Sequence, residues 1–146
     1  MSDVTRHVIA VDGMGGDNAP KSVIQGLSQF GDSGVHFLIY GNETELKPFA
    51  EQFLKNVSYE IRHTDVKVAS DMDVLSALRV GKSSSMGQAI NAVKSGEAEA
   101  VISAGNTGLY MALAKIILKT AEGIDRPAIA SFVPGKKGSS ICLDLG

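Results

Sequence analysis

An α/β fold, with a mainly parallel sheet and helices on both faces, is predicted by two patterns in the sequence. Short apolar runs that are typical of buried strands alternate along the chain with segments whose apolar residues recur at helical spacing. Such alternation builds βαβ units, whose strands are parallel and whose crossover helices cover the sheet. In addition, two of the apolar runs end in small and polar residues just before a helical pattern, as at the ligand-binding edge of open parallel sheets.

The first half of the chain contains the expected elements in strict alternation. We expect strands at residues 7–11, 35–40 and 59–62, and helices at residues 21–30 and 43–54. Pro20 suits the first turn of the first helix, and Asp17 or Asn18 is a candidate N-cap. Pro48 falls near the first turn of the second helix, where proline is tolerated.

The second half begins with a polar, irregular stretch at residues 63–71. We expect helices at residues 73–80, 85–94 and 107–121, and strands at residues 98–102, 129–133 and 140–145. Glycine and charged residues at 134–138 predict a turn, which makes the last two strands a candidate hairpin. Met111, Ala114 and Leu118 recur at helical spacing, and we expect them in the core.

The composition is that of one globular domain, with 146 residues, 44% hydrophobic and 21% charged. A net charge of −2 argues against a nucleic-acid partner. Cys142 lies in an apolar run and is expected to be a small buried hydrophobe. A single cysteine forms no internal disulfide, which fits a reducing compartment. Residues 1–7 are polar and no apolar run approaches ~18 residues, so we expect neither a signal peptide nor a membrane span, and a cytoplasmic location.

The first glycine-rich loop, residues 12–20, joins an apolar strand to a helix. Glycine tolerates positive φ and lets a ligand approach the backbone closely. The N-terminus of the helix that follows presents free N–H groups and a positive dipole end, which suits an anion. Asp12 and Asp17 flank the glycines, and they either bind a metal or accept backbone N–H bonds that hold the loop. The alternative to an anion site is a tight turn without a ligand.

The second loop, residues 103–108, also follows an apolar run and precedes a helix. Ser103, Asn106 and Thr107 bring hydroxyl and amide groups to the end of the strand. Asn106 or Thr107 can cap the helix, and an ordinary cap is the alternative to a functional site. Because ligands of open parallel sheets bind beyond the carboxyl ends of the strands, we expect both loops on the same edge.

A third candidate segment, residues 79–86, places two cations and three serines before a helical pattern. Arg79, Lys82 and the hydroxyl groups suit a phosphate. Residues 81–83 match the end of a Walker A loop, but Ser76 stands where that motif requires glycine. The alternative is a solvated loop with a serine that caps the next helix.

Five short motifs lie in order along the chain. They are Ile9-Ala10-Val11-Asp12-x-Met14-Gly15-Gly16-Asp17-x-Ala19-Pro20, Arg79 with Lys82-x-Ser84-Ser85-Met86, Ile102-Ser103-Ala104-Gly105-Asn106-Thr107-Gly108, Gly123-Ile124-Asp125-Arg126-Pro127-Ala128-Ile129-Ala130 and Leu143-Asp144-Leu145-Gly146. Together they resemble the PlsX-type phosphate acyltransferases of bacterial phospholipid synthesis. Gly13 stands where alanine is typical of that family, and Asn18 where histidine is common, so no acid–base role is expected for Asn18.

The resemblance implies both a fold and an activity. The fold would be similar to that of the isocitrate dehydrogenase and phosphotransacetylase group. The activity would be transfer of a fatty acyl group from acyl carrier protein to inorganic phosphate, giving acyl phosphate. Members of the family are more than twice as long, so we expect residues 1–146 to be the N-terminal part of a single acyltransferase domain, inactive alone. The full-length protein would be a homodimer that associates peripherally with the inner face of the membrane through its remaining part.

The loops and the resemblance together predict the site. The expected catalytic residues are Ser103, Asn106 and Thr107, with the Asn106 amide as the oxyanion donor. The expected phosphate and substrate ligands are Asp12, Gly15, Gly16, Asp17, Asn18, Arg79, Lys82, Ser84, Ser85, Gly105 and Gly108. We expect no cofactor and no metal, because no group of Cys and His has zinc spacing.

Two other classes of protein stay open. A dehydrogenase of the same fold group is disfavoured, because no G-x-G-x-x-G fingerprint follows the first strand. A phosphate-binding module without catalysis is the alternative to an enzyme. Among the histidines, we expect His7 at the surface, His36 packed or hydrogen-bonded, and His63 either solvated or paired with Asp65.

Overall fold

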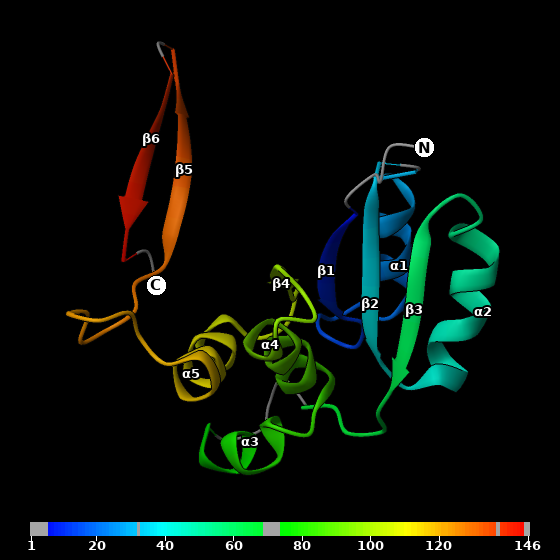
Figure 1. Ribbon diagram of the computed structural model, residues 1–146, viewed down its shortest axis with the longest axis horizontal. Helices are drawn as coiled ribbons and strands as arrows, with labels where there is room; N and C mark the ends of the chain where they lie inside the picture. The colour runs from blue at the N-terminus through cyan, green and yellow to red at the C-terminus, as the bar shows by residue number, and fades with distance from the viewer. Residues whose placement is uncertain (1–5, 32, 69–73, 137, 145–146) are drawn as a thin grey trace.

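A four-stranded parallel sheet forms the centre of the computed structural model, which describes residues 6–31, 33–68, 74–136 and 138–144 (Figure 1). The strands are β1 (His7–Asp12), β2 (Val35–Gly41), β3 (Ser58–His63) and β4 (Ala100–Ile102), in the spatial order β3-β2-β1-β4. All neighbouring strands are parallel, so that Ile9 of β1 pairs with Phe37 of β2 and with Ala100 of β4. The predicted α/β fold is confirmed.

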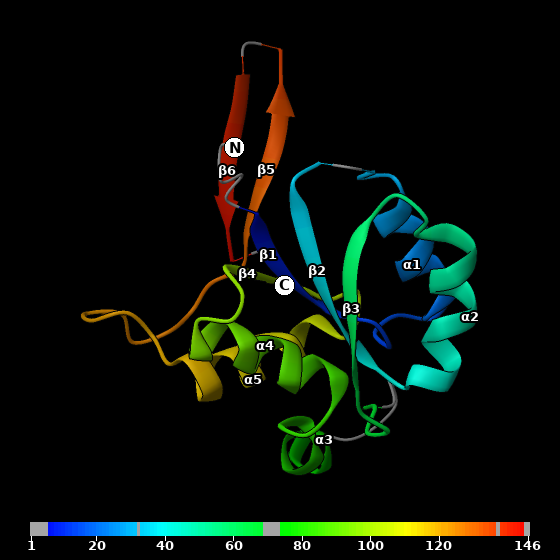
Figure 2. The same cartoon turned by 45° about the vertical axis from the view of Figure 1, so that its right-hand side comes forward.

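Helices cover both faces of the sheet, because alternate strand residues point to opposite sides (Figures 1 and 2). On one face Val11, Phe37 and Ile39 are buried beneath α1 (Lys21–Ser28) and α2 (Glu43–Phe53). On the other face Leu38 and Tyr40 pack against the alanines of α4 (Ser85–Ser95). An outer layer of α3 (Val74–Gly81) and α5 (Thr107–Leu118) packs on α4 and has its own apolar cluster.

The face of α5 that enters this cluster differs from the predicted one. Leu109, Leu113 and Ile117 are buried. Leu118 is 39% exposed, and Met111 is only partly buried, so the expectation that both are core residues is wrong. Helical spacing defines a set of stripes on a helix, and the direction from which a neighbouring helix packs decides which stripe is buried.

The last two strands, β5 (Ala130–Gly135) and β6 (Gly138–Leu143), form a separate antiparallel hairpin, as predicted. This arm projects from the body on the side of α5 (Figures 1 and 2). Phe132, Ile141 and Leu143 are 76%, 63% and 65% exposed. Cys142 is exposed as well, so its predicted burial is wrong, because neither face of the arm is covered in the described structure.

The element boundaries follow the predicted ones closely, with differences at the ends. The α5 helix ends at Leu118, whereas the sequence predicted an end at residue 121. The next residue, Lys119, adopts a positive φ of 69°. The N-cap position of α1 is Pro20, which makes no side-chain bond, so a cap by Asp17 or Asn18 is wrong. A backbone turn serves instead, in which the Asn18 carbonyl accepts the Ser22 N–H. The predicted positions 69–71, 73, 137 and 145 lie outside the described residues.

Candidate active site at the carboxyl ends of β1 and β4

A cavity of about 750 Å³ opens where β1 and β4 end. The chain order reverses between these strands, since β2 and β3 lie on one side of β1 and β4 on the other, and open parallel sheets bind ligands at such a reversal. The lining residues are Asp12, Met14, Gly15, Gly16, Asp17, Ala19, Lys67, Val68, Ser85, Met86, Ala104, Gly105, Asn106 and Leu109. The prediction that the two loops share one edge of the sheet is therefore confirmed.

Asp12 joins three segments of the chain at the floor of this cavity. Its side chain is 2% exposed and accepts hydrogen bonds from the Ser85 hydroxyl at 2.6 Å and the Ser103 hydroxyl at 2.7 Å. The Met14 N–H donates to the same carboxylate at 3.3 Å. Bonds to an ionised carboxylate are stronger than neutral ones, so Asp12 holds the ends of β1 and β4 and the start of α4 in one arrangement. Asp12 thus holds the loop as the structural alternative predicted, although only the Met14 N–H is a backbone donor and the other two donors are serine hydroxyls.

The two glycine-containing loops touch through their backbones. A Cβ atom on Gly15 would meet the Asp12 carboxylate and would lie 2.9 Å from the Gly105 nitrogen. Gly16 has a φ of +103°, in the region that favours glycine, and a Cβ there would lie 3.1 Å from the Ala104 carbonyl oxygen. Larger residues at these two positions would force the loops apart.

Ser84 and Ser85 occupy different places at the start of α4. Ser84 is fully buried, and its hydroxyl accepts the Gly87 N–H as the N-cap while it donates to the Gly81 carbonyl. Ser84 is therefore committed to capping, and only Ser85 reaches the cavity. The predicted alternative of a serine cap describes Ser84 correctly.

Asn106 caps α5 and leaves its amide nitrogen available. Its Oδ1 accepts the Leu109 N–H at 2.9 Å, which identifies the oxygen side of the amide. The Nδ2 group has no hydrogen-bond partner among the described residues, and Asn106 lines the cavity. Ser103, by contrast, donates to Asp12 and accepts the Gly105 N–H at 3.1 Å. A free N–H donor thus remains at Asn106, beside the first turn of a helix.

Lys67 is a lining residue that sequence reasoning missed. It lies in the irregular segment that follows β3 and is exposed, without an ion pair among the described residues. Val68 beside it and Met86 of α4 add apolar lining. A cation just after the carboxyl end of a predicted strand is the signal that could have identified Lys67, because all such ends lie at the same edge of a parallel sheet.

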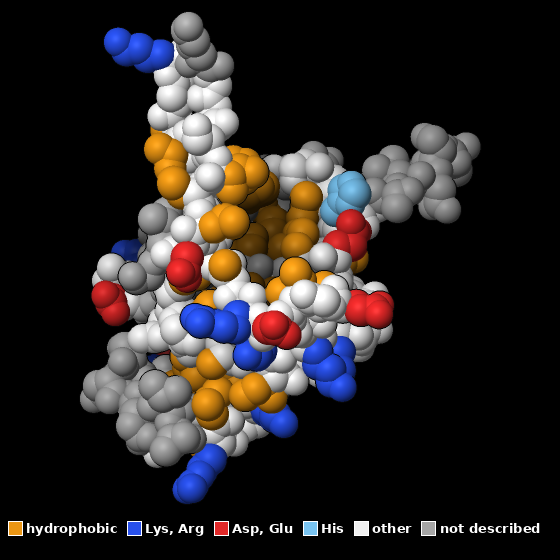
Figure 3. Space-filling model, turned by 90° about the vertical axis from the view of Figure 1, so that its left-hand side faces the viewer, with side chains coloured by type: hydrophobic (Ala, Val, Ile, Leu, Met, Phe, Trp, Pro, Cys, Tyr) orange, Lys and Arg blue, Asp and Glu red, His pale blue; other side chains and the backbone are white. Residues whose placement is uncertain are grey.

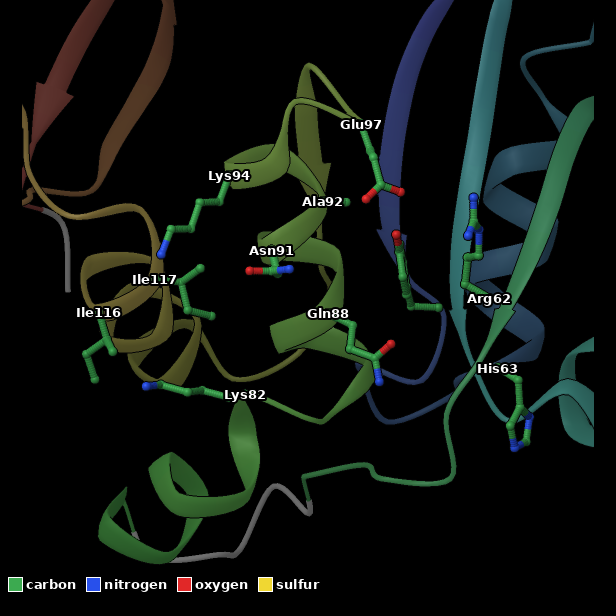
Figure 4. Close-up of a pocket in the computed structure, with 11 residues that line it drawn as sticks. Arg62, His63, Lys82, Gln88, Asn91, Ala92, Lys94, Glu97, Ile116 and Ile117 are labelled. Atoms are coloured by element: carbon green, nitrogen blue, oxygen red, sulfur yellow. The ribbon is translucent and has the colours of Figure 1, made fainter.

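Two predicted cations lie elsewhere. Lys82 lines a second cavity of about 440 Å³ between β3, α4 and α5, together with Arg62, Gln88 and Lys94 (Figure 4). Burial and the Glu97 carboxylate raise the pKa of Tyr40, which also lines this second cavity. Arg79 is exposed in the last turn of α3. The structure therefore does not bring Arg79 and Lys82 to the walls of the first cavity.

The remaining predicted residues lie around the rim. Asp17 lines the cavity, whereas Asn18 is exposed beside it. Thr107 and Gly108 form the first turn of α5, directly after Asn106, and both are exposed. Within the described ranges, no group of three or more His, Cys, Asp or Glu side chains could hold a metal ion.

The histidines lie away from the first cavity. The exposed His7 is bonded through Nδ1 to the Glu99 carboxylate at 2.9 Å, and His36 is bonded to the Ser58 hydroxyl at 2.8 Å. His63 Nε2 lies 3.3 Å from the Asp65 carboxylate, so the predicted pairing with Asp65 is present. In the part of the chain that the structure describes, no helix has the length and hydropathy to cross a membrane.

Comparison with known proteins places this α/β chain in a family. A family model described as fatty acid synthesis protein matches residues 7–146. A phosphate acyltransferase of Parvibaculum lavamentivorans is 49% identical over 142 residues, which cover 94% of this chain and 39% of that protein. Phosphate acyltransferases of Rhodospirillum centenum and Rhodospirillum rubrum are 48% and 47% identical, over 97% and 95% of this chain.

The chain belongs to this fatty acid synthesis protein family, the PlsX family of phosphate acyltransferases, as the five motifs predicted. It spans 39% to 41% of the length of these curated relatives. The family is one of acyltransferases in lipid synthesis.

Proposed function

We propose that the protein transfers a fatty acyl group from acyl carrier protein to inorganic phosphate, giving acyl phosphate, and that the cavity between the β1 and β4 loops binds the phosphate. Family membership supports the reaction class. The observation that carries the proposal is the network at Asp12, which fixes the two loops edge to edge. With the loops fixed, the first turn of α5, the Asn106 amide and Lys67 surround one space.

The proposed step is a displacement at the thioester carbon. An oxygen of hydrogen phosphate attacks that carbon from ~3–3.5 Å, a C–O bond forms and the C–S bond breaks, and the leaving thiolate takes up the proton that the hydrogen phosphate loses. Because phosphate is the nucleophile, no serine or cysteine of the protein needs to carry the acyl group. The protein has to hold the phosphate and stabilise the oxyanion that forms on the carbonyl oxygen.

Asn106 suits the second task. Its oxygen is held by the Leu109 N–H, so the amide plane is fixed without help from a substrate. The Nδ2 group is then a preorganised donor, and removal of one such donor from an oxyanion site costs on the order of 10²–10³ in rate. Lys67 and the positive end of α5 provide the charge that favours phosphate.

The test uses a protein of the relatives' full length that contains this chain, here called the full-length enzyme. Asn106→Ala should lower turnover by about 10²–10³, measured as acyl phosphate formed from acyl-acyl carrier protein. The matched control is Asn42→Ala, because Asn42 caps α2 by accepting the Thr44 and Glu45 N–H groups. Both variants lose a cap of about 1 kcal/mol, but only the Asn106 variant should lose turnover.

The outcomes separate three readings. If Asn106→Ala folds and keeps its rate, Asn106 is a structural cap only. If the unmodified enzyme binds phosphate yet forms no acyl phosphate, the protein is a phosphate-binding module without catalysis. If it does neither, the proposed function is wrong.

A further inference from the structure

A third cavity adjoins the proposed active site along α5 and is almost entirely apolar. It has a volume of about 470 Å³, within the usual range for small-molecule sites. On α5 it is lined by Thr107, Met111, Ala114 and Leu118, which recur every three or four residues and so form one stripe along the helix. Ile124, Pro127 and Ile129, from the segment that follows α5, also line it.

The stripe begins where the proposed active site ends. Asn106 lines the first cavity, and the next residue, Thr107, lines the apolar one. The two cavities therefore meet at consecutive residues, at the start of α5. The α5 helix has 12 residues, so it extends for about 18 Å. A bilayer core of ~30 Å is two acyl chains deep, so one chain needs about 15 Å, which is shorter than the helix that carries the stripe.

The groove has a fixed wall and lacks the charges that would oppose a hydrocarbon. The Tyr110 hydroxyl donates to the Val101 carbonyl at 3.2 Å, which holds the ring against β4, and burial raises the pKa of Tyr110. No acidic side chain lines the groove, and the charged lining residues Lys115 and Lys119 are exposed. Leu118 and Ile124 are 39% and 52% exposed, which leaves apolar surface for an occupant. Figure 3 shows hydrophobic side chains gathered on the face where α5 and the β5–β6 arm lie.

We propose that this groove binds the acyl chain of the substrate, and that Leu118, at the other end of the stripe from Thr107, and Ile124 set the chain length that the enzyme accepts. The inference rests on the proposed function, because the carbonyl end of the chain must lie at the Asn106 amide. Each further methylene buried in such a groove is removed from water, so the groove favours long chains over short ones.

The experiment measures kcat/KM of the full-length enzyme with octanoyl- and hexadecanoyl-acyl carrier protein. Leu118→Trp and Ile124→Trp add bulk to the groove from α5 and from the segment that follows it, and both positions are exposed enough to tolerate the change. Each variant should lose at least about 10-fold with the hexadecanoyl substrate and change less than about twofold with the octanoyl substrate. Ile116→Trp is the matched control, because Ile116 is 45% exposed on α5 but lines the second cavity.

Three results would overturn the inference. If the control loses the long substrate as strongly as Leu118→Trp does, the effect does not come from this groove. If all variants keep the unmodified chain-length profile, or lose both substrates equally, another part of the protein covers this face. In both cases the unmodified enzyme still forms acyl phosphate. If it forms none from either substrate, the proposed function has failed and the groove proposal with it.

Discussion

Asp12 shows how one carboxylate can hold distant segments of a chain together. Its two oxygens accept from Ser85 and Ser103, which lie 73 and 91 residues away in the sequence. Both hydroxyl protons point to Asp12, so these serines contribute position rather than donors to the proposed phosphate site. An exposed carboxylate in the same loop, Asp17, has no such partners among the described residues.

Asp12→Asn is expected to destabilise the protein. The change removes the negative charge from the group to which two hydroxyl groups donate. Hydrogen bonds to charged groups contribute about 1.5–3 kcal/mol each to the free energy of unfolding. We expect the free energy of unfolding to fall by about 1–3 kcal/mol in urea denaturation, because the amide oxygen still accepts one bond. Asp17→Asn, in the same loop, should change it by less than about 0.5 kcal/mol. Equal effects would contradict the role of Asp12.

The exposed pair His7 and Glu99 provides a pH-dependent contact that joins the start of β1 to the turn before β4. The hydrogen bond from His7 lowers the pKa of Glu99 from its ordinary value. A lowered carboxyl pKa stabilises the fold above the ordinary pKa, and this contribution is lost as the pH falls through the lowered one. His7→Ala should raise the pKa of Glu99 in a carboxyl NMR titration, whereas His63→Ala should leave it unchanged. The interpretation fails if His7→Ala leaves it unchanged.

At the scale of elements, the site depends on how closely two loops approach. The loop after β1 and the loop after β4 meet at Gly15 and Gly105, where no side chain separates the backbones. Each loop leads into a helix, so a displacement of one loop would move the start of α1 or α5. The approach therefore fixes the width of the proposed phosphate site.

Gly15→Ala should disrupt this approach. The added Cβ would meet the Asp12 carboxylate and the Gly105 backbone, neither of which can move without breaking the network. We expect a loss of about 1–3 kcal/mol in stability, with a large loss of acyl phosphate formation in the full-length enzyme. Gly26→Ala is the control, because that Cβ would meet nothing within 4 Å and alanine favours the helix interior of α1. A Gly15→Ala enzyme with normal activity would contradict the close-packed loops.

At the scale of the whole molecule, apolar surface is exposed at one edge of the sheet and on the β5–β6 arm. The β4 strand lies at the edge of the sheet with Ile102 48% exposed, and the β5–β6 arm exposes apolar residues on both strands. The chain also spans only 39% to 41% of its curated relatives. These facts support the expectation that a working cleft needs protein beyond the described surface.

The 146-residue chain alone should therefore form no acyl phosphate. Oxyanion donors must be held to a fraction of an ångström and shielded from water, and an uncovered site does neither. The measurement is acyl phosphate release by the purified chain, with the full-length enzyme as the control. Turnover comparable with the control would show that the site is complete within this chain.

The loops of the candidate site could be predicted from the sequence because their signals are local. Apolar runs ending in glycine and polar residues identified both loops, and Asn106 was recognised as a cap candidate from its place before a helical pattern. Lys67 was missed because it lies in a segment without periodicity, where its place after the end of a predicted strand was the only local signal. Lys82 was placed near the site because it precedes Ser85 closely, yet the turn between α3 and α4 directs it to another cavity.

The sequence by itself determined the parallel α/β class, the order of its strands and helices, the two loops and the family, since periodicity and short motifs are local properties of a chain. The tertiary structure alone decided that Asp12 bonds both Ser85 and Ser103, that Leu113 and not Leu118 is buried, and that an apolar groove begins beside Asn106. Those features depend on how distant segments pack against one another. Packing sets the rotation of each helix and the direction of each loop, and neither is encoded in the spacing of neighbouring residues.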